Sequence, residues 1–161
     1  MKRLILCALL LSAAMASADT DPVVNVTGGA VQGRLLADGN VAVFKGIPFA
    51  APPVGNLRWR EPHPVKPWRG VRDAGDFSAS CMQPAREDNR NPTGYKEDCL
   101  YLNVWAPGWP SKTRKPVMFY LYGGGNMTGS AAVPRLDGAE LSRQGVIVVT
   151  INYRLGLFGY F

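Results

Sequence analysis

Residues 116–153, PVMFYLYGGGNMTGSAAVPRLDGAELSRQGVIVVTINY, decide the fold class of this chain. An apolar run over 116–122 leads into three consecutive glycines, and a second apolar run fills 146–153. Between them a short helical pattern covers 136–144 and stops at Gly145. Strand, loop, helix and strand make a βαβ unit with a right-handed crossover, which is typical of an α/β fold.

The run over 146–153 is nearly all apolar, which favours a strand that is covered on both faces, as in an α/β sheet. No later strand follows within these 161 residues. We therefore expect the outer edge of this strand to be unpaired, which is a liability for aggregation.

Further strands are expected on the N-terminal side of the βαβ unit. Short β-branched runs fill residues 23–43, and the breaks at 28–29 and 38–40 carry Gly, Asp and Asn, which favour hairpin turns. Residues 100–106 read as another strand, which Pro107 ends. Hairpins should thus precede the main sheet.

Two connections carry little regular structure in this interpretation. Prolines recur through residues 47–70, which excludes a helix and a central strand there. We expect an extended crossing whose anchors are Trp59 and Trp68. Residues 82–98 are polar and interrupted by Pro and Gly, so we expect a loop.

Residues 1–18 have the pattern of a cleaved secretory signal. A positive start is followed by an apolar stretch over 4–14, and Ala16-Ser17-Ala18 forms a small-residue cleavage site. The apolar stretch is shorter than the about 20 residues that cross a bilayer. We expect a signal peptide over 1–18, a secreted or periplasmic mature chain over 19–161, and no membrane partner after cleavage. An uncleaved membrane anchor is the alternative.

The charge does not indicate a nucleic-acid partner. The chain has 18 Lys and Arg against 12 Asp and Glu, and removal of Lys2 and Arg3 leaves 16 against 12, a net charge of +4. The basic residues alternate with Pro, Trp and Asp instead of forming the clustered patch that nucleic acid requires. We interpret this charge as solvated surface.

Cys81 and Cys99 remain after signal removal, and export would place them in an oxidising compartment. A disulfide is the simplest interpretation. It would close a loop of about 18 residues and stabilise the fold by roughly 3 kcal/mol through loop-closure entropy. Two free buried thiols are the alternative. A metal site is disfavoured because two sulfurs and one distant His make a poor ligand set, and no cofactor is expected.

Three consecutive glycines after a strand have several uses. They admit backbone conformations closed to other residues and let N–H groups approach a ligand. Such N–H groups can hold a negative charge that develops on oxygen, worth roughly 2.7–4 kcal/mol per donor. A phosphate cradle is the rival, but residues 123–130 lack the Lys of a P-loop and the G-x-G-x-x-G register. A plain tight turn is the simplest alternative.

Four segments of the mature chain carry a family resemblance. These are FKGIPFA over 44–50, PVGNLRW over 53–59, EDCLYLNVWAP over 97–107, and NYR over 152–154. With them the chain resembles the type-B carboxylesterase and cholinesterase family of α/β-hydrolases. The resemblance implies the N-terminal part of that α/β fold, with a mixed, mostly parallel sheet preceded by β-hairpins.

The resemblance also implies roles for single residues. Gly124 and Gly125 match the glycines whose backbone N–H groups form two arms of the family's oxyanion hole, and Gly123 matches a supporting glycine. Cys81 and Cys99 match the family's N-terminal disulfide. The implied activity is hydrolysis of small-molecule carboxylic esters through a serine acyl-enzyme. Residues 82–98 contain no Trp of the kind that holds the choline cation in cholinesterases, which disfavours choline esters.

The rest of that catalytic machinery is missing from these residues. No G-x-S-x-G occurs, and the one histidine, His63, lies between prolines ahead of the core strands, where we expect a surface position. We therefore expect an N-terminal portion, truncated before the nucleophile elbow, that supplies the oxyanion loop to a full-length esterase and is inactive alone. The alternatives are a non-catalytic cholinesterase-like binding protein and a truncated fragment without function.

Overall fold

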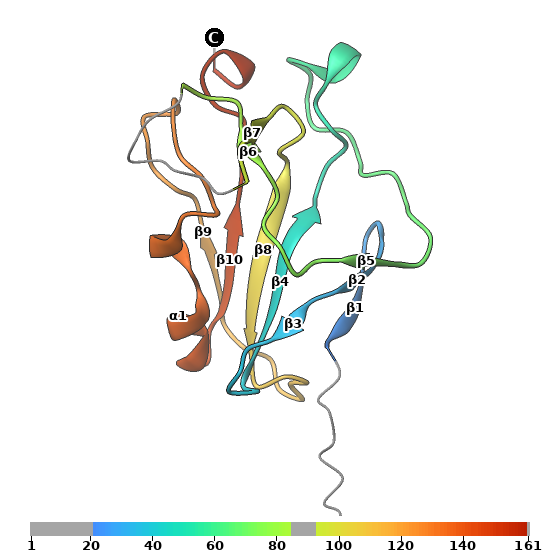
Figure 1. Ribbon diagram of the computed structural model, residues 1–161, viewed down its shortest axis with the longest axis vertical. Coiled ribbons are helices and arrows are strands. Elements are labelled where there is room, and N and C mark those ends of the chain that lie inside the picture. Colours follow the sequence, from blue (N-terminus) through green and yellow to red (C-terminus); the bar gives the residue numbers. More distant parts are fainter. Residues whose placement is uncertain (1–20, 85–92, 161) are drawn as a thin grey trace, which may run out of the picture.

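The computed structural model describes residues 21–84 and 93–160; the expected signal peptide and part of the expected loop over 82–98 lie outside this range. Its main element is a five-stranded sheet in the order β3-β4-β8-β10-β9 (Figure 1). The strands are β3 (Arg34–Leu35), β4 (Val41–Pro48), β8 (Tyr101–Pro107), β9 (Val117–Tyr120) and β10 (Ile147–Ile151).

The sheet is mixed, which confirms the expected α/β class, but its pairings are mostly antiparallel among the described residues. Strands β3, β4, β8 and β10 pair antiparallel in turn, and only β10 and β9 are parallel. The expectation of a mostly parallel sheet is therefore wrong for this part of the chain. The single βαβ unit supplies the one parallel pair, whereas β3 and β4 form a hairpin and β4, β8 and β10 pair antiparallel across longer connections.

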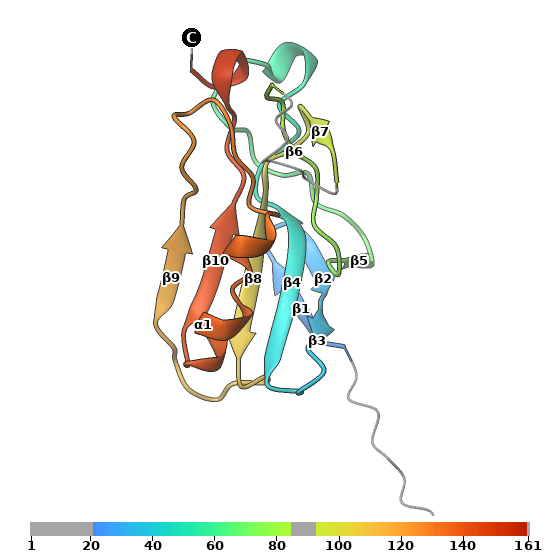
Figure 2. The ribbon, with the colours of Figure 1, turned by 60° about the vertical axis from the view of Figure 1, so that its left-hand side comes forward.

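The free edge of the sheet is also not where the sequence placed it. Strand β10 pairs with β8 on one side and with β9 on the other, so β9 is the edge strand (Figure 2). The crossover carries the chain over one face of the sheet and returns β10 to the position beside β8. The prediction of an unpaired edge on 146–153 is wrong, and that exposure belongs to Val117–Tyr120.

A smaller sheet covers one face of the main sheet. It contains β1 (Val23–Val26), β2 (Gly29–Gln32) and β5 (Val71–Asp73), with an antiparallel hairpin between β1 and β2 and a parallel pair between β2 and β5. Trp68 packs on the turn of this hairpin and donates its indole N–H to the carbonyl oxygen of Ala30 at 2.9 Å. Both expected hairpins and the Trp68 anchor are confirmed.

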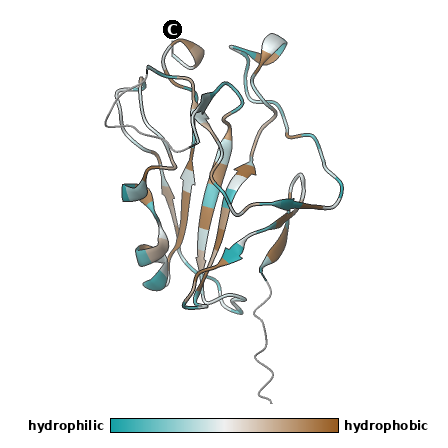
Figure 3. Ribbon diagram, in the orientation of Figure 1, coloured by the Kyte–Doolittle hydropathy of each residue, from teal (hydrophilic) through white to brown (hydrophobic). Residues whose placement is uncertain are grey.

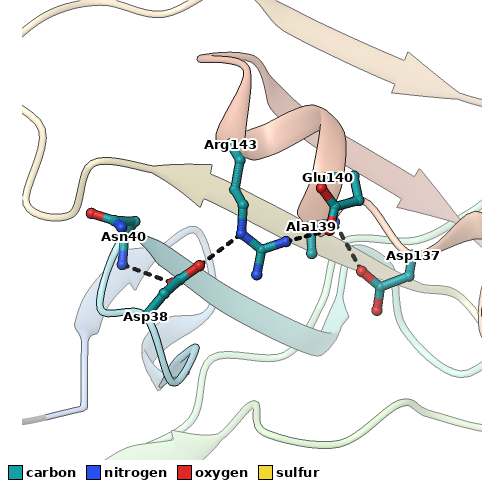
Figure 4. Close-up of polar contacts among 6 residues, drawn as sticks. All are labelled: Asp38, Asn40, Asp137, Ala139, Glu140 and Arg143. Carbon is teal, nitrogen blue, oxygen red and sulfur yellow. Dashed lines mark hydrogen bonds and ion pairs between the residues drawn. The ribbon is translucent and has the colours of Figure 1, made fainter.

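The other face carries the helix α1 (Ala139–Arg143), which is shorter than the expected 136–144. A 3-10 turn, η3 (Pro134–Leu136), precedes it, and the Asp137 carboxylate accepts the N–H of Ala139 at 2.8 Å. Arg143 joins the helix to the β3–β4 hairpin through the carboxylate of Asp38 at 2.7 Å (Figure 4). Helix and hairpin are thus held together at their polar ends.

The core has three clusters: two lie on opposite faces of β4 and β8, and the third packs Tyr122 and Leu155 against the two cysteines. Ala42 and Phe44 pack toward the small sheet, whereas Val43 and Trp105 pack toward α1. Hydropathy follows this arrangement, because apolar residues concentrate along the strands of the main sheet (Figure 3). Each large side chain buried here contributes roughly 1.5–3 kcal/mol. Strand β9, the outer strand of the βαβ unit, lies outside these core clusters.

The proline-rich crossing is anchored at the end of the sheet where the chain ends (Figure 1). It contains η1 (Gly55–Leu57), and Arg58 forms two 2.7 Å hydrogen bonds to the carboxylate of Glu97. Trp59 donates its indole N–H to the carbonyl oxygen of Leu157 in η4 (Gly156–Phe158), so this anchor is confirmed although the ring is 56% exposed. His63 is exposed, as expected.

Candidate active site

The segment that follows β9, residues 123–130, is called the glycine loop below. It leaves the carboxyl end of β9 and runs toward η3 and α1 (Figure 1). The adjacent parallel strand β10 ends on the same side, and ligands of open α/β sheets bind outside the carboxyl ends of such strands. The topology therefore places this loop where a site is expected.

Three glycines of the loop, Gly124, Gly125 and Gly129, hold positive φ values that other residues rarely adopt. Gly124 has φ of +145°, and a Cβ on it would lie 1.8 Å from the carbonyl oxygen of Thr128. Gly125 has φ of +60° but faces open space. Gly123 has neither a positive φ nor a close neighbour. Among the three consecutive glycines, only Gly124 is required by both backbone conformation and space.

The loop folds back on itself and, in the described part of the chain, leaves the N–H groups of residues 123–126 without a protein acceptor. The carbonyl oxygen of Gly124 accepts the N–H groups of Met127 and Thr128, both at 3.1 Å. Within residues 21–84 and 93–160, the N–H groups of Gly124 and Gly125 donate to no protein acceptor. Both glycines are exposed. Adjacent free N–H groups can bind an anion or a developing negative charge on oxygen.

The start of the loop is fixed to the end of β10 by two tyrosines. The rings of Tyr122 and Tyr153 stack with centroids 4.5 Å apart, and the Tyr153 hydroxyl donates to the carbonyl oxygen of Tyr122. Burial raises the pKa of Tyr122 well above its ordinary value, so its hydroxyl stays protonated. This pair sets the position at which the glycines begin.

The end of the loop is held by polar side chains. Gln83 bonds both backbone groups of Gly129, and the hydroxyl groups of Ser80 and Ser130 lie 2.5 Å apart. Asn152 accepts the N–H of Ala131 at 3.0 Å and donates to the carbonyl oxygen of Ala79 at 3.1 Å. Buried polar groups with satisfied bonds make this junction rigid.

The disulfide lies next to this junction. Cys81 and Cys99 are joined, as predicted, with their Cα atoms 4.9 Å apart. Cys81 belongs to β6 (Ser80–Cys81), which pairs with β7 (Tyr95–Lys96). The disulfide therefore anchors the segment that carries Ser80 and Gln83.

An apolar hollow of about 260 Å³ adjoins the glycine loop. Its lining includes Met82, Met127, Leu155 and Phe158, together with Gln83. Thioether and aliphatic side chains of this kind suit uncharged organic groups. Among the described residues, no group of three or more His, Cys, Asp or Glu is placed to hold a metal ion. No helix of that part of the chain is long and apolar enough to cross a membrane.

The sequence singled out the three glycines and the two cysteines, and the structure places them at one end of the sheet. It did not single out Gln83, Ser130 or Asn152 as parts of a common junction. Gln83 and Gly129 are separated by 46 residues, and no periodicity or motif marks the pair. Asn152 carries no signal in the sequence beyond its place in the NYR segment of the family resemblance.

Sheet order, crossover and loop position define this chain as part of an α/β-hydrolase fold. A solved structure of PNB esterase superposes with a TM-score of 0.81 at 41% identity, covering 88% of this chain and 29% of that chain. The family model described as Carboxylesterase family matches residues 20–161. The chain belongs to the carboxylesterase family.

Individual relatives agree with this assignment. Fumonisin B1 esterase of Sphingopyxis macrogoltabida is 51% identical over 134 residues, which cover 82% of this chain and 24% of that protein. Carboxylesterase 1D of Rattus norvegicus is 42% identical over 158 residues, covering 87% and 27%. Acetylcholinesterase of Bungarus fasciatus is 43% identical over 144 residues, covering 82% and 24%. The chain thus spans about a quarter of the length of these curated relatives.

Proposed function

We propose that this chain supplies the oxyanion loop of a carboxylic ester hydrolase that works through a serine acyl-enzyme. One observation carries the proposal: the adjacent N–H groups of Gly124 and Gly125 are exposed and have no acceptor in the described part of the chain. Gly123 supports their placement. The glycine conformations and the family membership support the same role.

In this proposal the two N–H donors act in the transition state of ester hydrolysis. Attack of a serine oxygen on an ester carbonyl converts the carbonyl oxygen into an oxyanion, which placed N–H donors stabilise by roughly 2.7–4 kcal/mol each. The serine elbow, the acid and the histidine base are not among these 161 residues. In this proposal they belong to the polypeptide that carries the chain, and the isolated chain does not turn over esters.

The substrate is proposed to be a small, uncharged carboxylic ester. The apolar hollow beside Met127 supports this, since its lining offers no charge to a substrate. One relative is named for fumonisin B1 and another for acetylcholine. Because residues 82–98 contain no Trp, we place choline esters behind simple alkyl esters.

An exported location is part of the proposal. Residues 1–18 have the signal pattern described above, and the Cys81–Cys99 disulfide is a bond that persists in oxidising compartments. The protein is thus proposed to be secreted or periplasmic. Fractionation of the native host, with the mature N-terminus sequenced at Asp19, tests this; a cytoplasmic chain that retains residues 1–18 contradicts it.

A graded alanine series tests the oxyanion role in the polypeptide that carries the serine elbow. Gly124→Ala forces a Cβ into the Thr128 carbonyl and should lower kcat by about 10²–10³-fold. Gly125→Ala meets open space and only left-handed strain of roughly 1–2 kcal/mol, so about tenfold is expected. Gly123→Ala, with neither constraint, is the matched control and should have the mildest effect.

The series is read with p-nitrophenyl esters and with a fluorophosphonate that labels the serine. If Gly123→Ala lowers kcat as strongly as Gly124→Ala, the assignment of donors is wrong. If the wild-type polypeptide neither turns over esters nor takes the label, the binding-protein alternative replaces the esterase. Hydrolysis by the isolated chain over 19–161, abolished by the same label, would overturn the placement of the nucleophile outside it.

A further inference from the structure

Gln83 makes an unusual set of contacts with the glycine loop. Its Nε2 donates to the carbonyl oxygen of Gly129 at 2.7 Å, and its Oε1 accepts the N–H of Gly129 at 2.8 Å. The same Nε2 also donates to the carbonyl oxygen of Cys81 at 3.0 Å. One side-chain amide therefore bonds both backbone groups of a loop residue, as a neighbouring strand would.

The orientation of this amide is determined by its partners. A backbone N–H can only donate and a carbonyl oxygen can only accept. If the amide were flipped, its NH2 group would face the N–H of Gly129 and its oxygen would face the carbonyl oxygen of Gly129. The third bond, to Cys81, ties the amide to the half-cystine two residues earlier. The bond to Cys81 thus holds the Gln83 side chain independently of its bonds to the loop.

Gly129 has little freedom to move away from Gln83. It is buried, and a Cβ on it would lie 2.3 Å from the Tyr122 ring, so its backbone rests directly against that side chain. Tyr122 is itself stacked on Tyr153. Gly129 is therefore enclosed between a tyrosine at the start of the loop and an amide from another segment.

Thr128 links the contact between Gln83 and Gly129 to the proposed donor Gly124. Thr128 precedes Gly129, and its carbonyl oxygen stands close enough to Gly124 to exclude a Cβ there. The N–H of Thr128 also donates to the carbonyl oxygen of Gly124 at 3.1 Å. A shift of Gly129 must therefore move Thr128 and with it the backbone of Gly124.

We propose that Gln83 is a positioning residue of the esterase reaction: its amide places Gly129 and, through Thr128, the donor N–H of Gly124. This inference rests on the proposed function and extends it to a residue outside the loop. Gln83 does not itself touch the reacting atoms. Its effect is expected in kcat, because a misplacement of about 1 Å near a reacting group costs on the order of 10²-fold.

Two substitutions and a matched control test this role in the intact protein. Gln83→Leu removes all three hydrogen bonds at similar volume and should lower kcat by roughly 10–100-fold, with KM within about threefold of wild type. Gln144→Leu is the control, since Gln144 is exposed at the end of α1, ahead of β10, whereas the loop lies beyond the carboxyl ends of β9 and β10. A lower melting temperature with unchanged kcat would show a purely structural role and overturn the proposal.

Gln83→Glu adds a pH signature that a structural role would not produce. The introduced carboxylate can accept the N–H of Gly129 but faces two carbonyl oxygens, which raises its pKa. Protonation gives it an O–H that can donate to one of them. The ratio of variant to wild-type kcat should therefore rise as pH falls from 8 to 5. A flat or falling ratio contradicts the hydrogen-bond geometry.

Amide hydrogen exchange separates this inference from the proposed function. In Gln83→Leu the peptide that contains residues 123–130 should exchange faster than in wild type and in Gln144→Leu. If the wild-type protein hydrolyses no ester, the proposed function fails, and faster exchange still shows that Gln83 places the loop. Unchanged exchange together with unchanged kcat overturns the inference.

Discussion

Strands β4 and β9 are both apolar and lie in the same sheet, yet their surroundings are opposite. Val41, Ala42, Val43 and Phe44 of β4 are at most 3% exposed, whereas Val117, Met118, Phe119 and Tyr120 of β9 are 41–60% exposed. Strand β4 has a neighbour on both edges, with the small sheet over one face and Phe77 and Ala139 of α1 over the other. Strand β9 has one neighbour and no covering layer among the described residues.

The comparison shows that apolar sequence is not sufficient for burial. A hollow of about 310 Å³ lies between β9 and the η3–α1 segment, lined by Met118, Tyr120, Leu136 and Leu141. The α1 helix has only five residues and packs over β8 and β10 instead. Hydrophobic free energy follows the area removed from water, so β9 contributes far less to stability than its composition indicates.

Replacing a phenylalanine of each strand by alanine should give the largest difference in stability between β4 and β9. Phe44→Ala empties a site that is 3% exposed and should lower the free energy of unfolding by about 3–5 kcal/mol. Phe119→Ala, at 57% exposure, should change it by no more than about 0.5 kcal/mol. Urea denaturation followed by tryptophan fluorescence measures both. Equal losses would mean that β9 is packed in solution.

Removal of the disulfide should have the next largest effect. The Cys81→Ala/Cys99→Ala variant releases a loop with a sequence separation of 18, which is worth roughly 3 kcal/mol in loop-closure entropy. The loss should be the same in wild type and in Phe119→Ala, since the described strands of this loop, β6 and β7, belong to a different sheet from β9. Thermal unfolding with and without reductant measures it. A destabilisation below about 1 kcal/mol would show that the segment is fixed by its hydrogen bonds alone.

The ion pair between Arg58 and Glu97 should make a smaller, pH-dependent contribution. The hydrogen bonds from Arg58 lower the pKa of Glu97 below its ordinary value of 4.5. A carboxyl group with a lowered pKa stabilises the fold above its unfolded pKa and loses that contribution as pH falls below it. The stability difference between wild type and Glu97→Gln should therefore be present at pH 6 and shrink toward pH 3.

Urea midpoints across that pH range check this expectation. Glu61→Gln is the control, because Glu61 is exposed and has no ion pair within 4 Å in the described part of the chain. A Glu97→Gln difference that grows toward acidic pH has the wrong sign and contradicts the depressed pKa.

A charge on β9 should have the smallest effect on folding. Phe119→Lys leaves the core untouched, so the free energy of unfolding should stay within about 0.5 kcal/mol. It should instead reduce concentration-dependent self-association, since charged residues on an edge strand block pairing between chains. Sedimentation velocity measures this. Val54→Lys, at 44% exposure and outside any strand, is the control, and an equal reduction there would show a general effect of charge.

Several parts of the fold could be predicted because they depend on near neighbours in the sequence. The turns at 28–29 and 38–40 place Gly, Asp and Asn between β-branched runs, and both form the expected hairpins. Trp68 is an anchor, as a large aromatic in a proline-rich crossing should be. The helix was predicted too long because Pro134 begins a separate 3-10 turn and Gly138 follows it.

In the candidate site, too, local features could be predicted from the sequence and long-range contacts could not. Exposed N–H groups are one of the uses that three glycines after a strand allow, and the structure shows Gly124 and Gly125 in that state. Their oxyanion role stays a proposal. The contact between Gln83 and Gly129 could not be predicted, since it joins segments 46 residues apart and neither residue is distinctive alone.

The sequence by itself determined the local chemistry: the hairpin turns, the consecutive glycines that leave backbone N–H groups open, and the cysteines able to pair. Only the tertiary structure decided which strand is the edge and which side chain holds the loop. Turn and strand preferences act over a few residues, whereas strand order and the Gln83 contact depend on how the crossover packs on the sheet. The residues of 116–122 therefore form a strand for local reasons, and their exposure follows from the arrangement of the other strands.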